Sequence, residues 1–340
     1  MMPNWREAGA PARSDRLAAA LALTLVLAGA WPAPSPASAQ EQGQVDVVLD
    51  GKGWGHGVGM AQDGALAMGA AGSSTEEILA AFYPGTSLGE AGGAIDVSIT
   101  SQPAVEIGFP AGGQVRDASS GQQSAGFPVT VQPGGSVAVS GDGGLFRVVP
   151  LAGAVPEPLP PPPPTTTVPN APTVPPTVAP PLEPTSSGPL WAVPAGGATA
   201  EVGGTGRYRG ILRMEGGDGG VQVVNRVDVE DYLRGMGEIR DPGWPAASLQ
   251  AQAIAARTYA VRAIRSGSTL CPDDRCQVYL GATAEYSAMD SAVAATAGQV
   301  LLYNGSLALS VYSARGGGIS ATPAEGFRKP DGEYHQLVSS

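Results

Sequence analysis

The sequence predicts an α+β protein with a β-rich N-terminal segment, a Pro-rich linker and a mixed C-terminal domain. Candidate helices and strands are mixed along the chain, without the regular strand–helix alternation of a parallel sheet. A Pro/Thr-rich stretch at 152–190 interrupts this pattern, and the 340 residues include 49 Gly and 32 Pro. We therefore expect part of the chain to be linker, with ordered segments on both sides of it.

The N-terminus has the layout of a secretory signal peptide. Arg6, Arg13 and Arg16 precede an apolar run at 17–31, and small residues at 37–39 follow. The alternative is an uncleaved membrane anchor, but a run of about fifteen residues is short of the roughly 20 that cross a bilayer. We predict a signal peptide over 1–39, a secreted, extracytoplasmic protein and no membrane span after cleavage.

The segment 40–151 predicts a strand at 45–49, a Gly-rich loop, one helix and several strands. Ser74 and Glu77 have capping-box spacing, an apolar face runs from Ile78 to Tyr83, and Pro84-Gly85 ends the helix. Short β-rich runs at 95–99, 129–131, 137–139 and 146–149 are separated by Gly/Pro/Asp turns.

Residues 152–190 predict a disordered, semi-rigid spacer, because Pro removes backbone donors and favours extended polyproline conformations. This linker divides the mature chain into two parts. The second part, 191–340, begins with two runs that predict paired strands, 208–215 and 221–227.

Helix signals follow in the second part. Asp228 can cap a short helix that ends near residue 233. A longer helix is predicted from Pro245 to 265, with Gly267 as its end, and another from 290 to 297. Asn304-Gly305 then predicts a hairpin turn between two apolar runs.

Charge and cysteine content narrow the function. The net charge of -11 argues against nucleic acid as a partner, because nucleic-acid binders usually carry a basic face. Cys271 and Cys276 are close enough for a disulfide in an exported protein. The alternative is a zinc site, but zinc needs three or four ligands and the chain has only His56 and His335 as histidines. We expect no cofactor.

Several stretches together resemble the SpoIID/LytB family, named for the stage II sporulation protein D and the amidase enhancer. Residues 53–62 read GWGHGVGMAQ, 82–86 read FYPGT, 224–227 read VNRV, 230–235 read EDYLRG, 244–245 read WP and 251–259 read AQAIAARTY. Shorter matches are CQVY at 276–279, YS at 312–313 and GGG at 316–318. The resemblance covers nearly all of 199–330 plus 51–88, and not the linker or 94–150.

The resemblance implies a lytic transglycosylase that cuts peptidoglycan glycan strands, with Glu238 as the catalytic acid. Glycosidic cleavage needs an acid that protonates the leaving oxygen. In a lytic transglycosylase the sugar's own 6-hydroxyl then attacks, so one carboxyl serves as acid and then as base. A Glu protonated near neutral pH needs apolar surroundings, and Met236, Ile239 and Trp244 are its apolar neighbours in sequence.

Departures from the family pattern keep two further functions open. Glu238 lies in Gly-Glu-Ile-Arg where the family usually has Ser-Glu-Met-Pro, and Arg240 would favour the ionised carboxylate. Arg275 replaces a frequent His, and 312–315 (YSAR) replace a Ser-rich turn. One alternative is a non-catalytic wall-binding module that activates an N-acetylmuramoyl-L-alanine amidase. The other is a structural wall protein whose linker spaces two glycan-binding parts.

Other candidate site residues are polar or aromatic. Trp54 can stack on sugar rings, and His56, flanked by glycines, is either a substrate contact or a loop His satisfied by backbone bonds. Gln252, Arg257 and Ser313 carry groups suited to sugar hydroxyls and carboxylates. Nothing predicts a nucleophile elbow, which argues against a Ser/His/Asp hydrolase.

Two expectations concern assembly. The segment 53–86 offers too small an apolar face to stand alone, so it should dock against 199–340 and bring His56 near Glu238. The chain stops soon after Tyr334-His335, where the resemblance leads us to expect the family domain to continue briefly.

Overall fold

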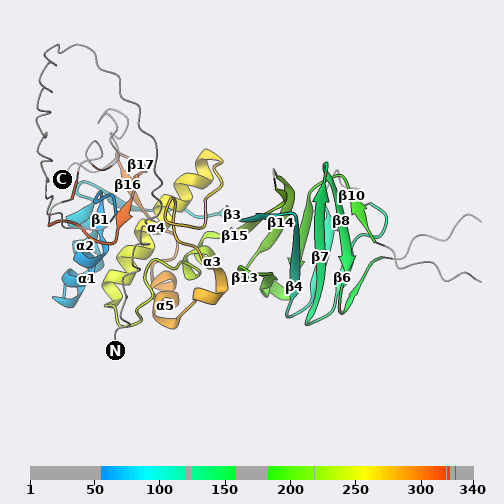
Figure 1. The fold of residues 1–340 in the computed structure, drawn as a ribbon. Helices are drawn as coiled ribbons and strands as arrows, with labels where there is room; N and C mark the ends of the chain where they lie inside the picture. Colours follow the sequence, from blue (N-terminus) through cyan, green and yellow to red (C-terminus); the bar gives the residue numbers. More distant parts are fainter. Residues whose placement is uncertain are drawn as a thin grey trace, which may run out of the picture. The chain divides into compact units, whose positions relative to one another are not determined.

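The computed structural model describes residues 55–118, 124–157, 183–217, 219–318, 320–321 and 326. The predicted signal peptide, the predicted strand at 45–49, Trp54 and most of the linker lie outside these residues. The fold is mixed α+β, with several antiparallel sheets and, among the described residues, five α-helices (Figure 1).

Local chemistry explains several of the helix ends. They are α1 (Gln62–Ala70), α2 (Thr75–Phe82), α3 (Val229–Arg234), α4 (Ala246–Ser266) and α5 (Ser287–Ala295). Ser74 and Glu77 form the predicted capping box of α2, and the Asp228 carboxylate accepts from the Glu230 N–H at the start of α3. Helix α4 ends at Gly267, which takes the left-handed conformation (φ 68°) that favours glycine.

Helix α4 is the centre of the helical part of the fold (Figure 1). It contacts α1, α2, α3, α5 and the strands β16 (Gln299–Tyr303) and β3 (Ala94–Gln102). Its alanines are buried on several sides of the helix, which lets neighbouring elements approach closely: Ala251, Ala253, Ala255, Ala256 and Ala260. Polar side chains of α4 are buried as well, namely Ser248, Gln252, Arg257 and Thr258, so the helix is enclosed by other elements.

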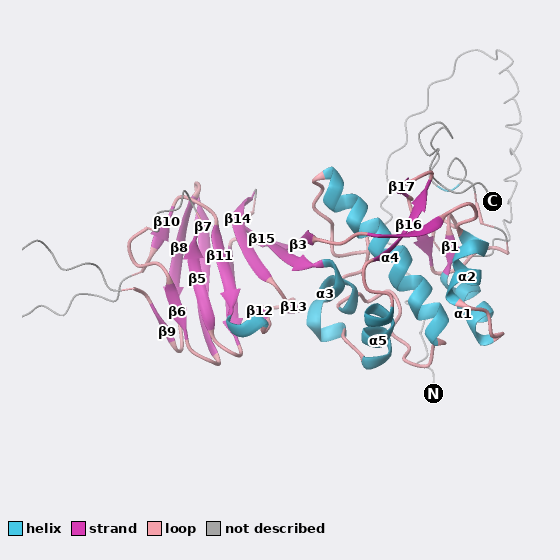
Figure 2. Ribbon diagram, turned by 180° about the vertical axis from the view of Figure 1, so that it is seen from behind, coloured by secondary structure: helices cyan, strands magenta, loops and turns pink. Residues whose placement is uncertain are grey.

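Two larger sheets form the β-rich part (Figure 2). The seven-stranded sheet has the order β3, β15 (Gly220–Asp228), β14 (Ile211–Gly217), β11 (Leu190–Pro194), β5 (Gly113–Asp117), β6 (Val129–Val131) and β9 (Ala154–Val155). The six-stranded sheet has the order β10 (Thr185–Ser186), β8 (Leu145–Pro150), β7 (Gly135–Asp142), β4 (Ala104–Phe109), β12 (Ala200–Val202) and β13 (Gly206–Tyr208).

The two larger sheets share one core. Alternate residues of β4 and β7 are buried, as expected for strands with one covered face, and β7 contacts β15 of the other sheet. The same continuous apolar cluster reaches α3, α4 and α5. The β-rich part and the helical part are therefore packed together through β3, β15 and α4.

The predicted linker does not separate two independent sheets. The seven-stranded sheet takes β3, β5, β6 and β9 from before it and β11, β14 and β15 from after it. Strands β9 and β10 and the first residue of β11 lie inside the predicted range 152–190, so the ends of that range are part of the sheets.

The segment 53–86 docks as expected, in the part of it that the structure describes. Strand β1 (Met60–Ala61) pairs in parallel with β18 (Tyr312–Ser313), and both α1 and α2 contact α4. The Ser248 hydroxyl of α4 donates to the carbonyl of Ala65 in α1 at 2.8 Å. These contacts join the start of the described chain to its end.

Several elements differ from the sequence prediction, including strands β4, β5, β11 and β12, which no sequence run predicted. Helix α1 was not predicted, because its two glycines and weak amphipathicity resemble a loop. Helix α5 begins three residues early. The hairpin turn at Asn304 (φ 49°) and Gly305 (φ 76°) is present, but its second strand, β17 (Ser306–Leu307), is short. Strand β16 gains its other neighbour from β2 (Ser87–Glu90), far away in sequence.

The shared sheet makes a prediction about fragments. A fragment 199–340 lacks β3, which pairs along the whole of β15, and lacks β1, α1 and α2. We expect it to show no cooperative thermal transition by circular dichroism, whereas the mature chain shows one. A fragment that melts like the whole protein would contradict the shared core.

Candidate functional site

A cavity of about 460 Å³ opens where four segments distant in sequence meet. The walls come from the loop before α1, the segment after α3, the loop that follows Cys271, and β18 with its flanking residues, together with Tyr259 of α4. The lining residues include Gly55, His56, Gln62, Glu238, Asp274, Cys276, Gln277, Val278, Tyr312 and Ser313. Glu238 and His56 thus border one cavity, as expected from the resemblance.

Glu238 is held by hydrogen bonds to its carboxyl group. Its Oε1 accepts from the backbone N–H of Val278 at 2.8 Å and from the hydroxyl of Tyr312 at 3.4 Å. Gln62 also contacts the carboxyl through its side chain. No described residue makes an ion pair with Glu238, so the carboxyl is anchored without a neutralising cation.

Burial raises the pKa of Glu238, because desolvation disfavours the ionised form. The bonds from Val278, Tyr312 and Gln62 oppose this rise, and the nearby negative charge of Asp274 adds to it. The expectation that Arg240 favours the ionised form is not met, since Arg240 is exposed and is not among the groups that set this pKa. A raised pKa is what a general acid needs near neutral pH.

The apolar surroundings of Glu238 differ from those its sequence neighbours predicted. Met236 and Ile239 are buried in the main core, and Trp244 packs against that core. The cavity wall instead takes its apolar surface from Tyr259, Val311 and Tyr312.

Glycine at 237 explains how Glu238 reaches its place. The segment 235–238 runs against 278–280, with the Gly237 N–H donating to the Val278 carbonyl at 2.9 Å. A Cβ on Gly237 would lie 2.6 Å from the side chain of Leu280. The departure from the family's usual Ser at this position therefore permits a closer approach of the two segments, and that approach delivers the Val278 N–H to Glu238.

His56 is a cavity residue with both ring nitrogens engaged. Nδ1 accepts from the Val58 N–H at 3.0 Å, so the proton of the neutral ring is on Nε2. Burial lowers the pKa of His56, while a hydrogen bond to the backbone of Tyr312 opposes this effect. The ring ties the loop to β18, which favours the interpretation of a loop His satisfied by backbone bonds.

Ser313 is a buried hydroxyl facing the cavity. The residue is only 7% exposed and lines the cavity. Among the described residues its Oγ has no hydrogen-bond partner. A buried polar group without a partner costs free energy, so this hydroxyl is an unsatisfied group at the cavity wall.

Gln252 lies behind the cavity wall. It is fully buried, and its Oε1 accepts from Gln62 Nε2 at 3.3 Å. It supports the lining residue Gln62 and is not itself a lining residue.

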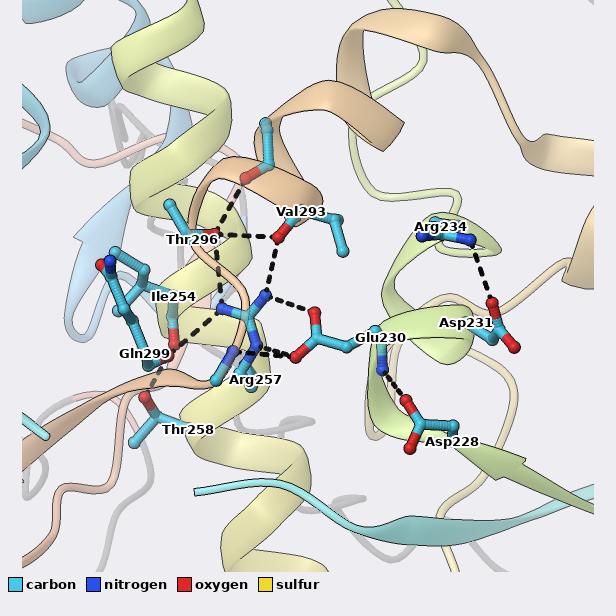
Figure 3. A network of polar contacts seen from close by, with 12 residues as sticks. Asp228, Glu230, Asp231, Arg234, Ile254, Arg257, Thr258, Val293, Thr296 and Gln299 are labelled. Carbon is cyan, nitrogen blue, oxygen red and sulfur yellow. Dashed lines mark hydrogen bonds and ion pairs between the residues drawn. The ribbon is translucent and has the colours of Figure 1, made fainter. Parts of the chain in front are cut away.

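Arg257 is a structural residue, and the structure corrects its predicted role in substrate binding. Its fully buried side chain forms a two-pronged ion pair with Glu230, at 2.8 and 2.7 Å (Figure 3). The remaining N–H groups donate to the Val293 and Gln299 carbonyls and to Thr296. All five donors of the guanidinium are used, which leaves none for a sugar.

Cys271 and Cys276 form a disulfide, with Cα atoms 5.5 Å apart. Among the described residues, no group of three or more His, Cys, Asp and Glu side chains is placed to hold a metal ion. Within the same residues, no helix has the length and apolar character needed to cross a membrane.

The disulfide predicts how many free thiols the denatured protein contains. Protein recovered from an oxidising compartment and denatured without reductant should contain no free thiol, and two would contradict the bridge. Because the closed loop is short, replacing both cysteines by serine should cost at most about 2 kcal/mol of unfolding free energy, measured by denaturant titration.

The fold and site define a mixed α+β protein with a half-buried glutamate, Glu238, in the wall of a cavity. The model of the family described as SpoIID, Stage II sporulation protein, matches residues 217–303, which include Glu238. The chain therefore carries a SpoIID family domain, and the resemblance inferred from the motifs is confirmed.

Two curated relatives are similar to part of the chain. An uncharacterized protein of Brachyspira hyodysenteriae (strain ATCC 49526 / WA1) is 35% identical over 102 residues, 28% of this chain and 28% of the relative. The amidase enhancer of Bacillus subtilis (strain 168) is 39% identical over 82 residues, 24% of this chain and 11% of the relative. The matches thus cover well under two thirds of either relative. No solved structure matches the chain.

The family domain implies a cell-wall peptidoglycan context. Together with the disulfide it indicates an extracytoplasmic location.

Sequence reasoning missed several residues around Glu238. Val278 and Gln277 belong to the CQVY stretch and Tyr312 to the YS stretch, so the signal was present in the motifs. Their relation to Glu238 depends on backbone geometry, which no spacing along the chain reveals.

Proposed function

We propose that this protein is a secreted peptidoglycan lytic transglycosylase in which Glu238 is the single acid and base. The observation that carries the proposal is a half-buried carboxyl with a raised pKa that borders a cavity and has no paired cation among the described residues. Such a group stays protonated closer to neutral pH than an ordinary glutamate and can donate its proton to a leaving oxygen.

The reaction needs one carboxyl and no added water. Glu238 gives its proton to the glycosidic oxygen, and the bond from that oxygen to the anomeric carbon breaks as charge develops on the sugar ring. The 6-hydroxyl of the same sugar attacks the anomeric carbon and passes its proton to the Glu238 carboxylate. The products are a 1,6-anhydro sugar end and a free hydroxyl end, and Glu238 is protonated again.

Binding of the glycan is assigned to polar and aromatic groups of the cavity. The Ser313 hydroxyl, which has no partner among the described residues, would bond a sugar hydroxyl or N-acetyl oxygen, and the Tyr259 ring offers an apolar surface. His56 shapes the loop opposite Glu238. Trp54, a sugar contact predicted from the same Gly-rich motif, lies outside the described residues.

The N-terminal segment fits the same role. The predicted signal peptide at 1–39 would export the protein. Glycan strands outside the membrane are then the accessible substrate.

Product analysis tests the proposal. Purified mature protein is incubated with glycan strands, with and without stem peptides, and the products are analysed by mass spectrometry. We expect ends that carry a 1,6-anhydro sugar. Hydrolytic ends that carry a free reducing sugar would point to a glycosidase, and unchanged strands would reject cleavage.

The second candidate is activation of an amidase, favoured by the similarity to the amidase enhancer of Bacillus subtilis. In this function the cavity binds glycan without cutting it. The same incubation, repeated with an N-acetylmuramoyl-L-alanine amidase, separates the two. Faster release of stem peptides with unchanged glycan lengths would support activation.

A further inference from the structure

A chain of hydrogen bonds leads from the core to Glu238. The hydroxyl of Tyr232 in α3 donates to Gln277 Oε1 at 3.0 Å, and Gln277 Nε2 donates to the Tyr312 hydroxyl oxygen at 2.9 Å. The Tyr312 hydroxyl then donates to Glu238 Oε1. The first two residues of this hydrogen-bond chain, Tyr232 and Gln277, are both 0% exposed.

The direction of each bond in this chain is fixed by chemistry. Gln277 Nε2 also lies 3.4 Å from the carbonyl oxygen of Ala256, which can only accept, so the amide orientation is determined. Gln277 Oε1 therefore faces Tyr232, whose hydroxyl must donate. The Tyr312 oxygen accepts from the amide, and its one proton is left for Glu238.

The chain is rigid. The Tyr232 ring packs against the Tyr279 ring with centroids 4.8 Å apart, and the Tyr279 hydroxyl bonds the buried Asn225 at 2.7 Å. Burial raises the pKa of both Tyr232 and Tyr312, so each keeps its donor proton wherever Glu238 titrates. Neither hydroxyl can change from donor to acceptor by ionising.

We propose that Tyr312, oriented by Gln277 and Tyr232, is a positioning residue that assigns the proton of Glu238 to Oε2. Oε1 receives two donors, the Tyr312 hydroxyl and the Val278 N–H, and a protonated Oε1 would place its own proton against them. The proton is therefore assigned to Oε2, which receives neither of these two bonds, and Gln62 is the remaining side chain that bonds the carboxyl. The 3.4 Å bond from Tyr312 is long, as catalytic contacts often are before substrate binds.

The catalytic meaning of this arrangement rests on the proposed function, but its effect on the titration of Glu238 does not. A donor to the carboxylate favours the ionised form. Removing the Tyr312 hydroxyl should therefore move the titration of Glu238 to higher pH. Asp274 is the charged group that also acts on this titration, and it is unchanged in the variants below.

The test is a carbon-13 NMR titration of the Glu238 carboxyl in the mature protein, assigned by its absence in Glu238→Gln. In Tyr312→Phe the midpoint should rise by roughly half to one pH unit, the worth of a weak bond to a carboxylate. Tyr232→Phe, two bonds away, should raise it by less. If Tyr312→Phe does not fold, the rise of the midpoint in Tyr232→Phe tests the proposal instead.

Tyr286→Phe is the matched control. The Tyr286 hydroxyl donates to the carbonyl of Ile239, next to Glu238 in sequence, and does not reach the carboxyl. Its removal should leave the midpoint unchanged. An unchanged midpoint in the folded Tyr312→Phe variant, or an equal rise in Tyr286→Phe, would overturn the proposal.

The rate profile adds a second readout. If the protein cleaves glycan, the alkaline limb of the pH profile of kcat/KM should move to higher pH in Tyr312→Phe, together with the NMR midpoint. Absence of cleavage by the wild type would reject the proposed function, while the NMR titration would still decide the role of Tyr312.

Discussion

Replacement of Glu238 by glutamine should lower the rate of glycan cleavage by about 10³-fold or more, because general acid catalysis contributes roughly 10²–10⁴-fold and this carboxyl supplies both proton transfers. Glutamine keeps the size of the side chain and can still accept from the Val278 N–H. The measurement is the initial rate of formation of 1,6-anhydro ends. Full product formation by Glu238→Gln would remove Glu238 from the mechanism.

Asp274→Asn is the matched control for this loss. Asp274 also lines the cavity and also changes from carboxylate to amide, but it acts on Glu238 only through its charge. Cleavage should persist. Since activity requires protonated Glu238 and Asp274 helps to raise its pKa, the alkaline limb of the rate profile should move to lower pH.

Thermal melting checks that Glu238→Gln is folded. The folded-state pKa of Glu238 is raised, so its contribution to stability is complete below the unfolded-state pKa. It is lost as pH rises through the folded-state pKa, where the carboxyl ionises against burial. The variant escapes this loss. Its Tm minus that of the wild type should therefore become more positive as pH rises.

Replacement of Arg257 by methionine should destabilise the fold by about 3–5 kcal/mol, a lowering of Tm by roughly 10 °C. The change leaves Glu230 without its partner and removes donors from two carbonyls and Thr296 (Figure 3). These groups join α3, α4, α5 and β16. Chemical denaturation monitored by circular dichroism measures the effect.

Arg226→Met is the matched control. Arg226 pairs with Asp96 on the surface, with 48% of its side chain exposed, and such pairs are worth about 0–1 kcal/mol. Adding Glu230→Met to Arg257→Met should restore part of the lost stability, because it removes the unpaired carboxylate. A loss in Arg257→Met no larger than that in Arg226→Met would contradict the structural role of this network.

Local patterns predicted the parts of the fold that local forces determine. The capping box of α2, the Asp228 cap of α3 and the Gly267 end of α4 follow from side-chain and backbone chemistry within a few residues. The antiparallel pair β14–β15 follows from its short turn. Strand order in the larger sheets could not be predicted, since β5–β11 and β3–β15 pair across the linker.

In the candidate site, too, some features could be predicted from the sequence and others depend on distant contacts. Motif resemblance located Glu238, His56 and Ser313, which do border one cavity. The same reasoning placed Arg257 among the sugar contacts, because a polar residue in an Ala-rich helix suits either a ligand or a buried partner. Only the position of Glu230, on a different helix, distinguishes these two outcomes.

The sheet topology also indicates where the length of this chain can change during evolution. Strands β9 and β10, which flank the Pro-rich stretch, lie at the free edges of the two larger sheets. Loop closure costs only about 0.6 kcal/mol for each doubling of loop length. Growth or shrinkage of the sequence between these edges is therefore nearly neutral for folding. Natural variants should differ in length there first, and a foreign domain inserted at that point should leave the cavity intact.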